Sequence, residues 1–201
     1  FILRAMMGFQ SGGAPDFHLY LHGMYVYPLR WLQRLFPGVA WFSLLEIVLL
    51  SLAMTVILKS ILQCWLRSGH SMWTGLALCA GFSALYGLHY FARITYTVVG
   101  AMLGAAAAAQ ILSIDCQNIS DRSIVRSMLL AVLLAALCYG LRQLSILPVL
   151  GYCGIAFLLR FFQCFGWRKQ RRRSPRPMLA AAGLVVLVLG GLAAARETEI
   201  Q

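Results

Sequence analysis

The chain has 201 residues, of which 61% are hydrophobic and only 11% are charged, and its formal net charge is +11. A soluble domain is closer to half apolar and a quarter charged, so this composition excludes a single soluble core and predicts a membrane protein. Six cysteines lie in or beside apolar runs without a CxxC pair, which argues against a disulfide framework or a zinc site.

Residues 1–37 predict an outer loop followed by an interfacial amphipathic helix. The stretch MYVYPLRWLQRLFPGVAW (24–41) interleaves Tyr, Trp and Arg with Leu and Phe, and Arg30 and Arg34 share one helical face at i,i+4 spacing. This pattern is typical of a helix lying in the headgroup plane. The alternative is that it forms only the flank of the first span. Because the chain begins at Phe1 and no signal-peptide pattern follows, we expect an N-terminally truncated fragment.

The region 38–195 predicts an all-α, polytopic transmembrane helical bundle of about six spans. Lipid leaves no partner for free backbone groups, so apolar segments of about 20 residues are expected to be helical. In the span near the middle of the chain, Gly100 and Gly104 form a GxxxG spacing followed by five alanines, which predicts that it packs inside the bundle. A short tail, 196–201, follows. The expected spans are 38–58, 72–91, 94–113, 126–141, 145–165 and 178–195.

The distribution of Lys and Arg predicts the orientation in the membrane. If residues 1–37 are outside, the inner loops carry ten basic residues and the outer segments six. We therefore expect a membrane protein whose basic run is cytoplasmic and contacts anionic lipid headgroups. No aromatic platform or known module accompanies the run, so we expect no nucleic acid partner. The run contains Arg168, Lys169, Arg171, Arg172, Arg173 and Arg176.

Four polar residues in or beside spans are candidates for a site at the outer face. Charges inside lipid are costly and usually serve a function. Glu46 is the one acidic residue within a predicted span, and it is a candidate catalytic carboxylate or proton carrier. His89, Arg93 and Arg142 lie at outer span ends and are candidates for substrate binding, since guanidinium groups suit phosphate. The simpler interpretation is that Glu46 forms a structural ion pair with one of these arginines.

The stretch GGAPDFHLYLHG (12–23) raises the question of a metal site. His18 and His22 are at i,i+4 spacing with Asp16 nearby, so the three side chains are weak candidates for ligands of a divalent metal. Asp16 is also a weak catalytic candidate. The alternative is that all three are ordinary polar residues of an interfacial turn, and the sequence favours this alternative because no second histidine pair or cysteine completes the set.

Three stretches resemble a broad group of bacterial polytopic proteins similar to integral-membrane glycosyltransferases of the GT-C type. They are SGGAPDFHLYLHGMYVYPLRWLQRLFPGVAWFSLL (11–45), LHYFARITYTVVGAMLGAA (88–106) and YGLRQLSIL (139–147). Their shared features are a Gly-rich turn, an LFP-x-x-x-W entry into the first span, and an arginine after a Gly-Leu pair.

The resemblance implies transfer of a sugar from a polyprenyl-phosphate donor at the outer face of a bacterial cytoplasmic membrane. It implies that Arg93 or Arg142 holds the donor phosphate, and that an acidic pair precedes the Gly-rich turn, upstream of Phe1. Asp16 does not match the position of that pair. Two other classes stay open: a small transporter or channel subunit that uses Glu46, and a non-catalytic membrane scaffold.

Overall fold

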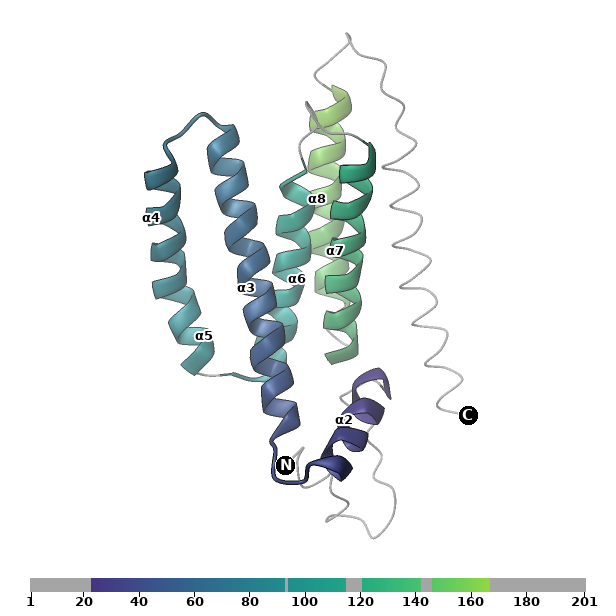
Figure 1. Ribbon diagram of the computed structural model, residues 1–201. Coiled ribbons are helices and arrows are strands. Elements are labelled where there is room, and N and C mark those ends of the chain that lie inside the picture. Colours follow the sequence, from purple (N-terminus) through teal and green to yellow (C-terminus); the bar gives the residue numbers. More distant parts are fainter. Residues whose placement is uncertain (1–22, 93, 115–120, 142–145, 167–201) are drawn as a thin grey trace.

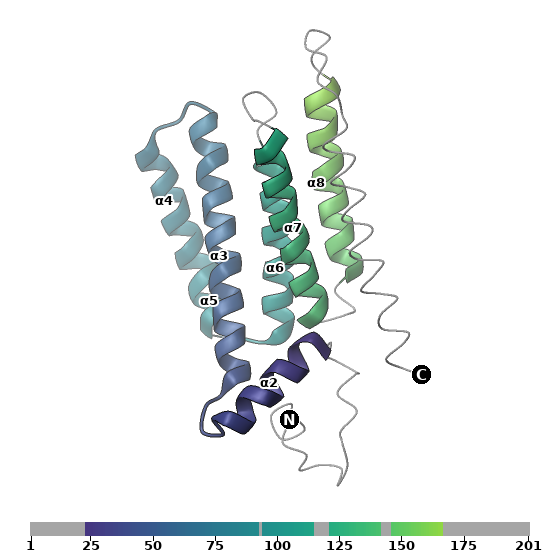
Figure 2. The same ribbon diagram turned by 45° about the vertical axis from the view of Figure 1, so that its right-hand side comes forward.

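The computed structural model describes residues 23–92, 94–114, 121–141 and 146–166, and every regular element in these ranges is helical. The long helices run up and down beside one another, and α2 lies obliquely across one end (Figures 1 and 2). We call this end the α2 end and the opposite end, where α3 turns into α4, the turn end. The elements are α2 (Gly23–Leu35), α3 (Trp41–Arg67), α4 (Met72–Phe82), η2 (Ser83–Gly87), α5 (Leu88–Ala92), α6 (Tyr96–Leu112), α7 (Asp121–Leu141) and α8 (Ile146–Gly166).

Three of the described helices are long and apolar enough to cross a membrane, as expected for an integral membrane protein. They comprise Trp41–Arg67, Met72–Ala92 (α4, η2 and α5 in succession) and Ile124–Leu141. Two shorter apolar helical segments are α6 (Tyr96–Leu112) and residues Gly151–Arg160 within α8. The all-α prediction is confirmed for the described ranges. The expected span 178–195, the tail 196–201 and the basic run from Arg168 to Arg176 lie outside them.

Helix α3 is longer than the span predicted for it. The expected span ended at residue 58, whereas α3 continues to Arg67, because no glycine or proline interrupts it before Gly69. Gly69 has a φ of +79°, the left-handed conformation that commonly follows a helix end. Lys59 and Arg67 therefore lie on a helix and not in a loop. With 27 residues, α3 is about 40 Å long, roughly 10 Å more than a hydrocarbon core.

Helix α6 is the centre of the bundle. It packs against α3, α7 and α8, and most of its residues are buried. Its small side chains allow this close approach: a Cβ atom on Gly104 would overlap the Val149 Cγ2 atom of α8 and lie 3.5 Å from the Val149 Cβ atom. The prediction that this alanine-rich helix lies inside the bundle is confirmed.

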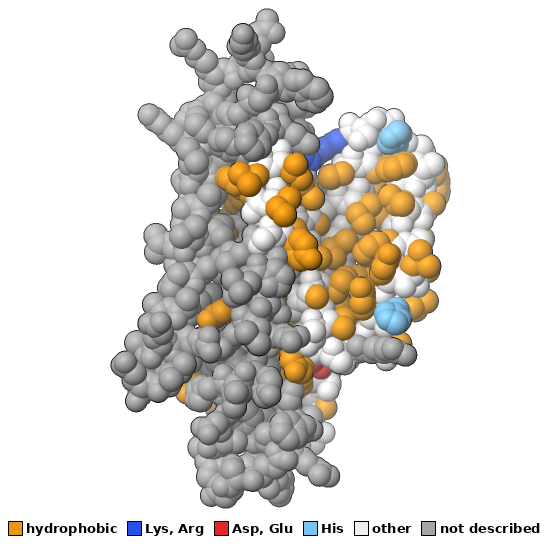
Figure 3. Space-filling model, turned by 180° about the vertical axis from the view of Figure 1, so that it is seen from behind, with side chains coloured by type: hydrophobic (Ala, Val, Ile, Leu, Met, Phe, Trp, Pro, Cys, Tyr) orange, Lys and Arg blue, Asp and Glu red, His pale blue; other side chains and the backbone are white. Residues whose placement is uncertain are grey.

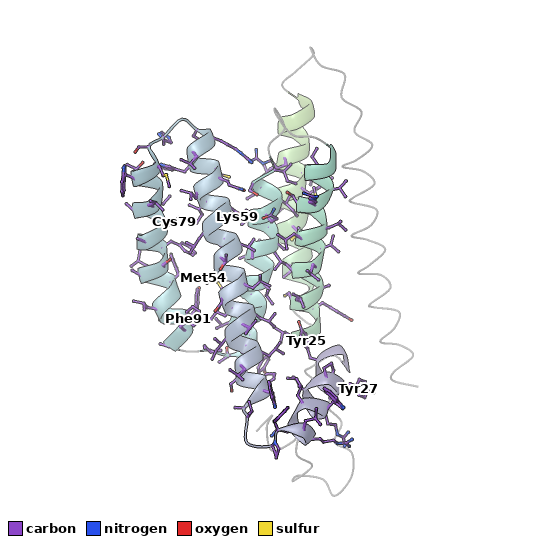
Figure 4. The ribbon with its side chains drawn as sticks, viewed as in Figure 1. Tyr25, Tyr27, Met54, Lys59, Cys79 and Phe91 are labelled. Carbon is purple, nitrogen blue, oxygen red and sulfur yellow. The ribbon has the colours of Figure 1, made fainter. Side chains whose placement is uncertain are left out.

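The α4–η2–α5 segment forms the outer layer on the far side of α3. Within the described ranges its main interhelix contact is with α3. Met54 on α3 faces the segment (Figure 4), and its Cε atom would lie 3.1 Å from a Cβ on Gly87. Large hydrophobic side chains cover the opposite, exposed face (Figure 3), as a lipid-facing surface requires; they include Trp73, Leu76, Leu85 and Leu88.

Candidate functional site

Glu46 is buried in the second turn of α3, near the α2 end. Its side chain is 7% exposed and shares the buried face of α3 with Phe42, Leu49 and Leu50. Among the described residues, no hydrogen bond or ion pair to its carboxylate is found. Because α3 and α6 run in the same direction (Figure 1), the first turns of α6 lie at the same end. A carboxylate in such apolar surroundings is costly when charged and marks a candidate functional site.

His89 lies at the same end of the bundle but on its outer layer. It is on α5, its side chain is exposed, and its ring lies edge-on to Tyr90 with centroids 5.7 Å apart. No hydrogen bond or ion pair joins His89 to Glu46. The structure thus brings both residues to one end of the bundle without placing them in direct contact.

The other predicted site residues lie outside the described ranges. They are Asp16, His18 and His22 of the expected loop, together with Arg93 and Arg142. Within the described ranges, no group of three or more His, Cys, Asp or Glu side chains is arranged to hold a metal ion. The divalent metal and the phosphate-binding arginines stay predictions.

Helix α2 packs against both α3 and α7 at this end of the bundle. Tyr25, Val26 and Leu29 form its buried face, and the Tyr25 hydroxyl donates a hydrogen bond to the Leu137 carbonyl oxygen at 3.2 Å. Figure 4 shows Tyr25 directed toward α7 and Tyr27 directed away from the bundle. Burial, with a smaller contribution from the neighbouring Cys138 thiol, raises the pKa of Tyr25 above its ordinary value. The hydroxyl therefore stays neutral and fixes α2 across the helix ends.

A second candidate site, which sequence reasoning missed, lies at the turn end between α3, α4 and α6. The cavity has a volume of about 390 Å³, within the range of small-molecule sites. Ser60, Cys64 and His70 line it together with apolar side chains. Ser60 is 3% exposed, and among the described residues its buried hydroxyl has no hydrogen-bond partner. These residues form no sequence motif, so only the packing of three helices reveals the pocket.

Two arginines converge on the last turn of α6, beside this pocket. Arg67, at the end of α3, donates a hydrogen bond to the Ser113 carbonyl oxygen, and Arg160 of α8 donates through Nε and Nη2 to the Leu112 carbonyl oxygen. Both guanidinium groups complement the partial negative charge of the α6 C-terminus.

The described tryptophans fall at the two ends of the bundle. Trp31 and Trp41 belong to the α2 end, and Trp65 and Trp73 to the turn end. The Trp65 ring contacts the His70 ring in a tilted arrangement with centroids 4.4 Å apart, and its Nε1 donates to the Thr74 hydroxyl at 2.9 Å. Trp is enriched at membrane–water interfaces, so this distribution agrees with a membrane plane at each end.

Comparison with known proteins finds no significant similarity to any protein-family model, curated protein or solved structure.

Proposed function

We propose that this protein is a six-span membrane glycosyltransferase of the GT-C-like kind, with its active face at the α2 end. The observation that carries the proposal is Glu46, a carboxylate buried in a membrane-spanning helix close to that end. The sequence resemblance supplies the reaction, and α2 with its exposed Tyr27, Arg30 and Trp31 supplies an amphipathic surface suited to the outer headgroup plane.

The dimensions of α3 support this placement in the membrane. Trp41 and Trp65 are 24 residues apart, which corresponds to about 36 Å along a helix. This distance exceeds a hydrocarbon core of about 30 Å and stays within the roughly 40–45 Å of a whole bilayer. Both tryptophans would then lie at the interfaces, with Glu46 about 7 Å inward from Trp41. A polyprenyl-phosphate donor presents its phosphate in the headgroup region beside Trp41, on the outer side of Glu46.

In the proposed reaction Glu46 acts as general base. It takes the proton from an acceptor hydroxyl, whose oxygen forms the new bond to the anomeric carbon of the sugar. The bond from that carbon to the phosphate oxygen breaks, and polyprenyl phosphate leaves with the electron pair. Arg93 or Arg142 would stabilise the leaving phosphate, as the resemblance implies, and a divalent metal would do the same. The acceptor side would approach between α2 and the first turns of α3.

Sugar transfer in membranes containing the chain tests the proposal. The substrate is a radiolabelled polyprenyl-phosphate sugar, and the measured quantity is label released from the lipid fraction. Glu46→Gln should lower the rate by about 100-fold or more, the ordinary contribution of a general base, and Glu46→Asp should retain part of it. Ser51→Ala, on the exposed face of the same helix, is the control. Equal rates for Glu46→Gln and the control would refute the assignment.

The burial of Glu46 also favours a second function, proton or cation transport. A transport path along the buried face of α3 would need polar groups between Glu46 and Ser60, which are about 21 Å apart along the helix. The buried side chains between them are apolar: Leu49, Leu50, Ala53, Met54, Val56 and Ile57. Proton flux into liposomes, followed with a pH-sensitive dye, distinguishes the two functions. Flux that persists in Glu46→Gln would eliminate transport through this carboxylate.

A further inference from the structure

We infer that the pocket at the turn end binds one anionic glycerophospholipid, with its headgroup beside Arg67 and an acyl chain in the groove between α3, α4 and α6. This site is at the opposite end of the bundle from the proposed active face and does not depend on it. Three independent features lead to the inference: an unpartnered buried hydroxyl, a largely apolar lining, and a concentration of positive charge.

The hydroxyl of Ser60 calls for an acceptor inside the pocket. It lines the cavity, is 3% exposed, and lacks a hydrogen-bond partner among the described residues. A serine in a helix commonly satisfies its hydroxyl on the carbonyl four residues earlier, as Ser68 does on Cys64 at 3.0 Å. Ser60 makes no such bond. A buried hydroxyl without a partner costs free energy, so an ester carbonyl oxygen of a bound lipid would stabilise it.

The remaining lining suits an acyl chain rather than a soluble metabolite. Ile61, Leu78, Ala109 and Leu112 supply apolar surface, and Leu78 and Leu112 are exposed at its margin. An acyl chain that enters past these two leucines moves from the lipid hydrocarbon to an apolar groove. No water has to be removed from its surface. Ser60 lies seven residues before Arg67 on the same helix, about 10 Å deeper along the axis. This order, from cation to hydroxyl donor to apolar groove, follows the order of phosphate, ester and acyl chain in a glycerophospholipid.

The charge at the turn end selects an anionic headgroup. Two guanidinium groups, from Arg67 and Arg160, lie at the last turn of α6 and donate to its carbonyl oxygens. In the described segments 59–71, 121–126 and 160–166, five residues are Lys or Arg and one is Asp. A phosphodiester accepts hydrogen bonds from guanidinium groups and is attracted by this excess charge. A zwitterionic lipid carries its own cation and gains less.

Native mass spectrometry of the whole chain in mild detergent tests the inference. Phosphatidylglycerol and phosphatidylcholine with identical acyl chains are titrated separately, and the first lipid bound is measured. The wild-type chain should bind phosphatidylglycerol about tenfold more tightly than phosphatidylcholine. Ser60→Ala should weaken phosphatidylglycerol by about two- to tenfold, the range of one neutral hydrogen bond. Ser51→Ala, outside the pocket on the same helix, should leave binding unchanged.

Two further variants separate the groove from the headgroup contact. Ala109→Leu fills the groove and should weaken both lipids. Arg67→Gln should remove the preference for phosphatidylglycerol, while Arg67→Lys should keep most of it, because Lys retains the charge. Ser60→Ala removes no existing hydrogen bond and should fold normally even if Ala109→Leu does not. Equal binding of the two lipids by the wild-type chain, or wild-type phosphatidylglycerol binding by Ser60→Ala, would overturn the inference.

Discussion

Replacing Gly104 by alanine tests the close packing of α6 against α8. A Cβ at this position would overlap the Val149 Cγ2 atom and lie 3.5 Å from both the Val149 Cβ and Cγ1 atoms. Valine in a helix has one strongly preferred rotamer, so turning its Hβ atom toward Gly104 would place the side chain in a disfavoured conformation. We expect the two helices to separate instead, which sacrifices dispersion contacts along the seam.

The expected cost follows from comparison with a glycine that has space around it. At Gly151 on α8, no atom lies within 4 Å of the position that an added Cβ would take. Both substitutions gain the same helix propensity, about 1 kcal/mol, so the difference between them isolates the packing effect. Overpacking typically costs about 1–3 kcal/mol. We expect Gly104→Ala to be less stable than Gly151→Ala by that amount.

The assay is reversible unfolding in mixed micelles, followed by circular dichroism as the fraction of denaturing detergent rises. A second substitution, Val149→Ala, removes both methyl groups and should restore much of the stability in the Gly104→Ala background. The coupling between the two sites should be about 0.5–3 kcal/mol, the range for residues in contact. Equal stability of Gly104→Ala and Gly151→Ala, or simple additivity of the effects at 104 and 149, would refute the close packing of this seam.

Three further predictions concern other contacts, two of them checked by the same unfolding measurement and the third by tryptophan fluorescence. Tyr25→Phe should lower the free energy of unfolding by about 0.5–1.5 kcal/mol at neutral pH. Because burial raises the pKa of Tyr25 above 10.0, the stability of the wild-type chain should fall relative to that of Tyr25→Phe as pH rises past that value. Parallel pH profiles of the two chains would contradict this. Arg160→Gln should cost about 1.5–3 kcal/mol through the lost charged hydrogen bond to Leu112, whereas no change would mean that the α6 terminus does not need it. Gly75→Ala places a Cβ 2.9 Å from the Trp65 ring and should shift Trp fluorescence, and an unchanged spectrum would argue against close α3–α4 contact.

Hydropathy and length were sufficient to predict where most helices lie. The segments 72–91, 94–113 and 145–165 were expected to be helical, and the helices Met72–Ala92, Tyr96–Leu112 and Ile146–Gly166 lie there. The boundaries of α3 and α7 were less accurate, since both helices extend beyond the apolar core into residues that carry charge. Hydropathy reports where lipid must be, whereas a helix ends where its backbone changes conformation, as at Gly69.

One of the two candidate sites could be identified from the sequence, and the other only from the fold. Glu46 was identifiable because a single carboxylate in an apolar run is conspicuous, and Gly100 and Gly104 indicated a helix that packs closely. The pocket around Ser60 had no signature, since one serine in a helix is unremarkable until its hydroxyl is found buried without a partner. The convergence of Arg67 and Arg160 likewise joins residues far apart in sequence.

The sequence alone therefore determined that the chain lies in a membrane, that it is helical, and roughly where its helices are. Backbone groups in lipid leave little choice of secondary structure. Only the tertiary structure decided which face of each helix meets another helix. A helix that is apolar on every side has no amphipathic stripe to distinguish protein from lipid, so neighbours are chosen by the fit of small residues such as Gly104 against α8. The burial of Glu46 and the pocket beside Ser60 likewise depend on which helices are neighbours.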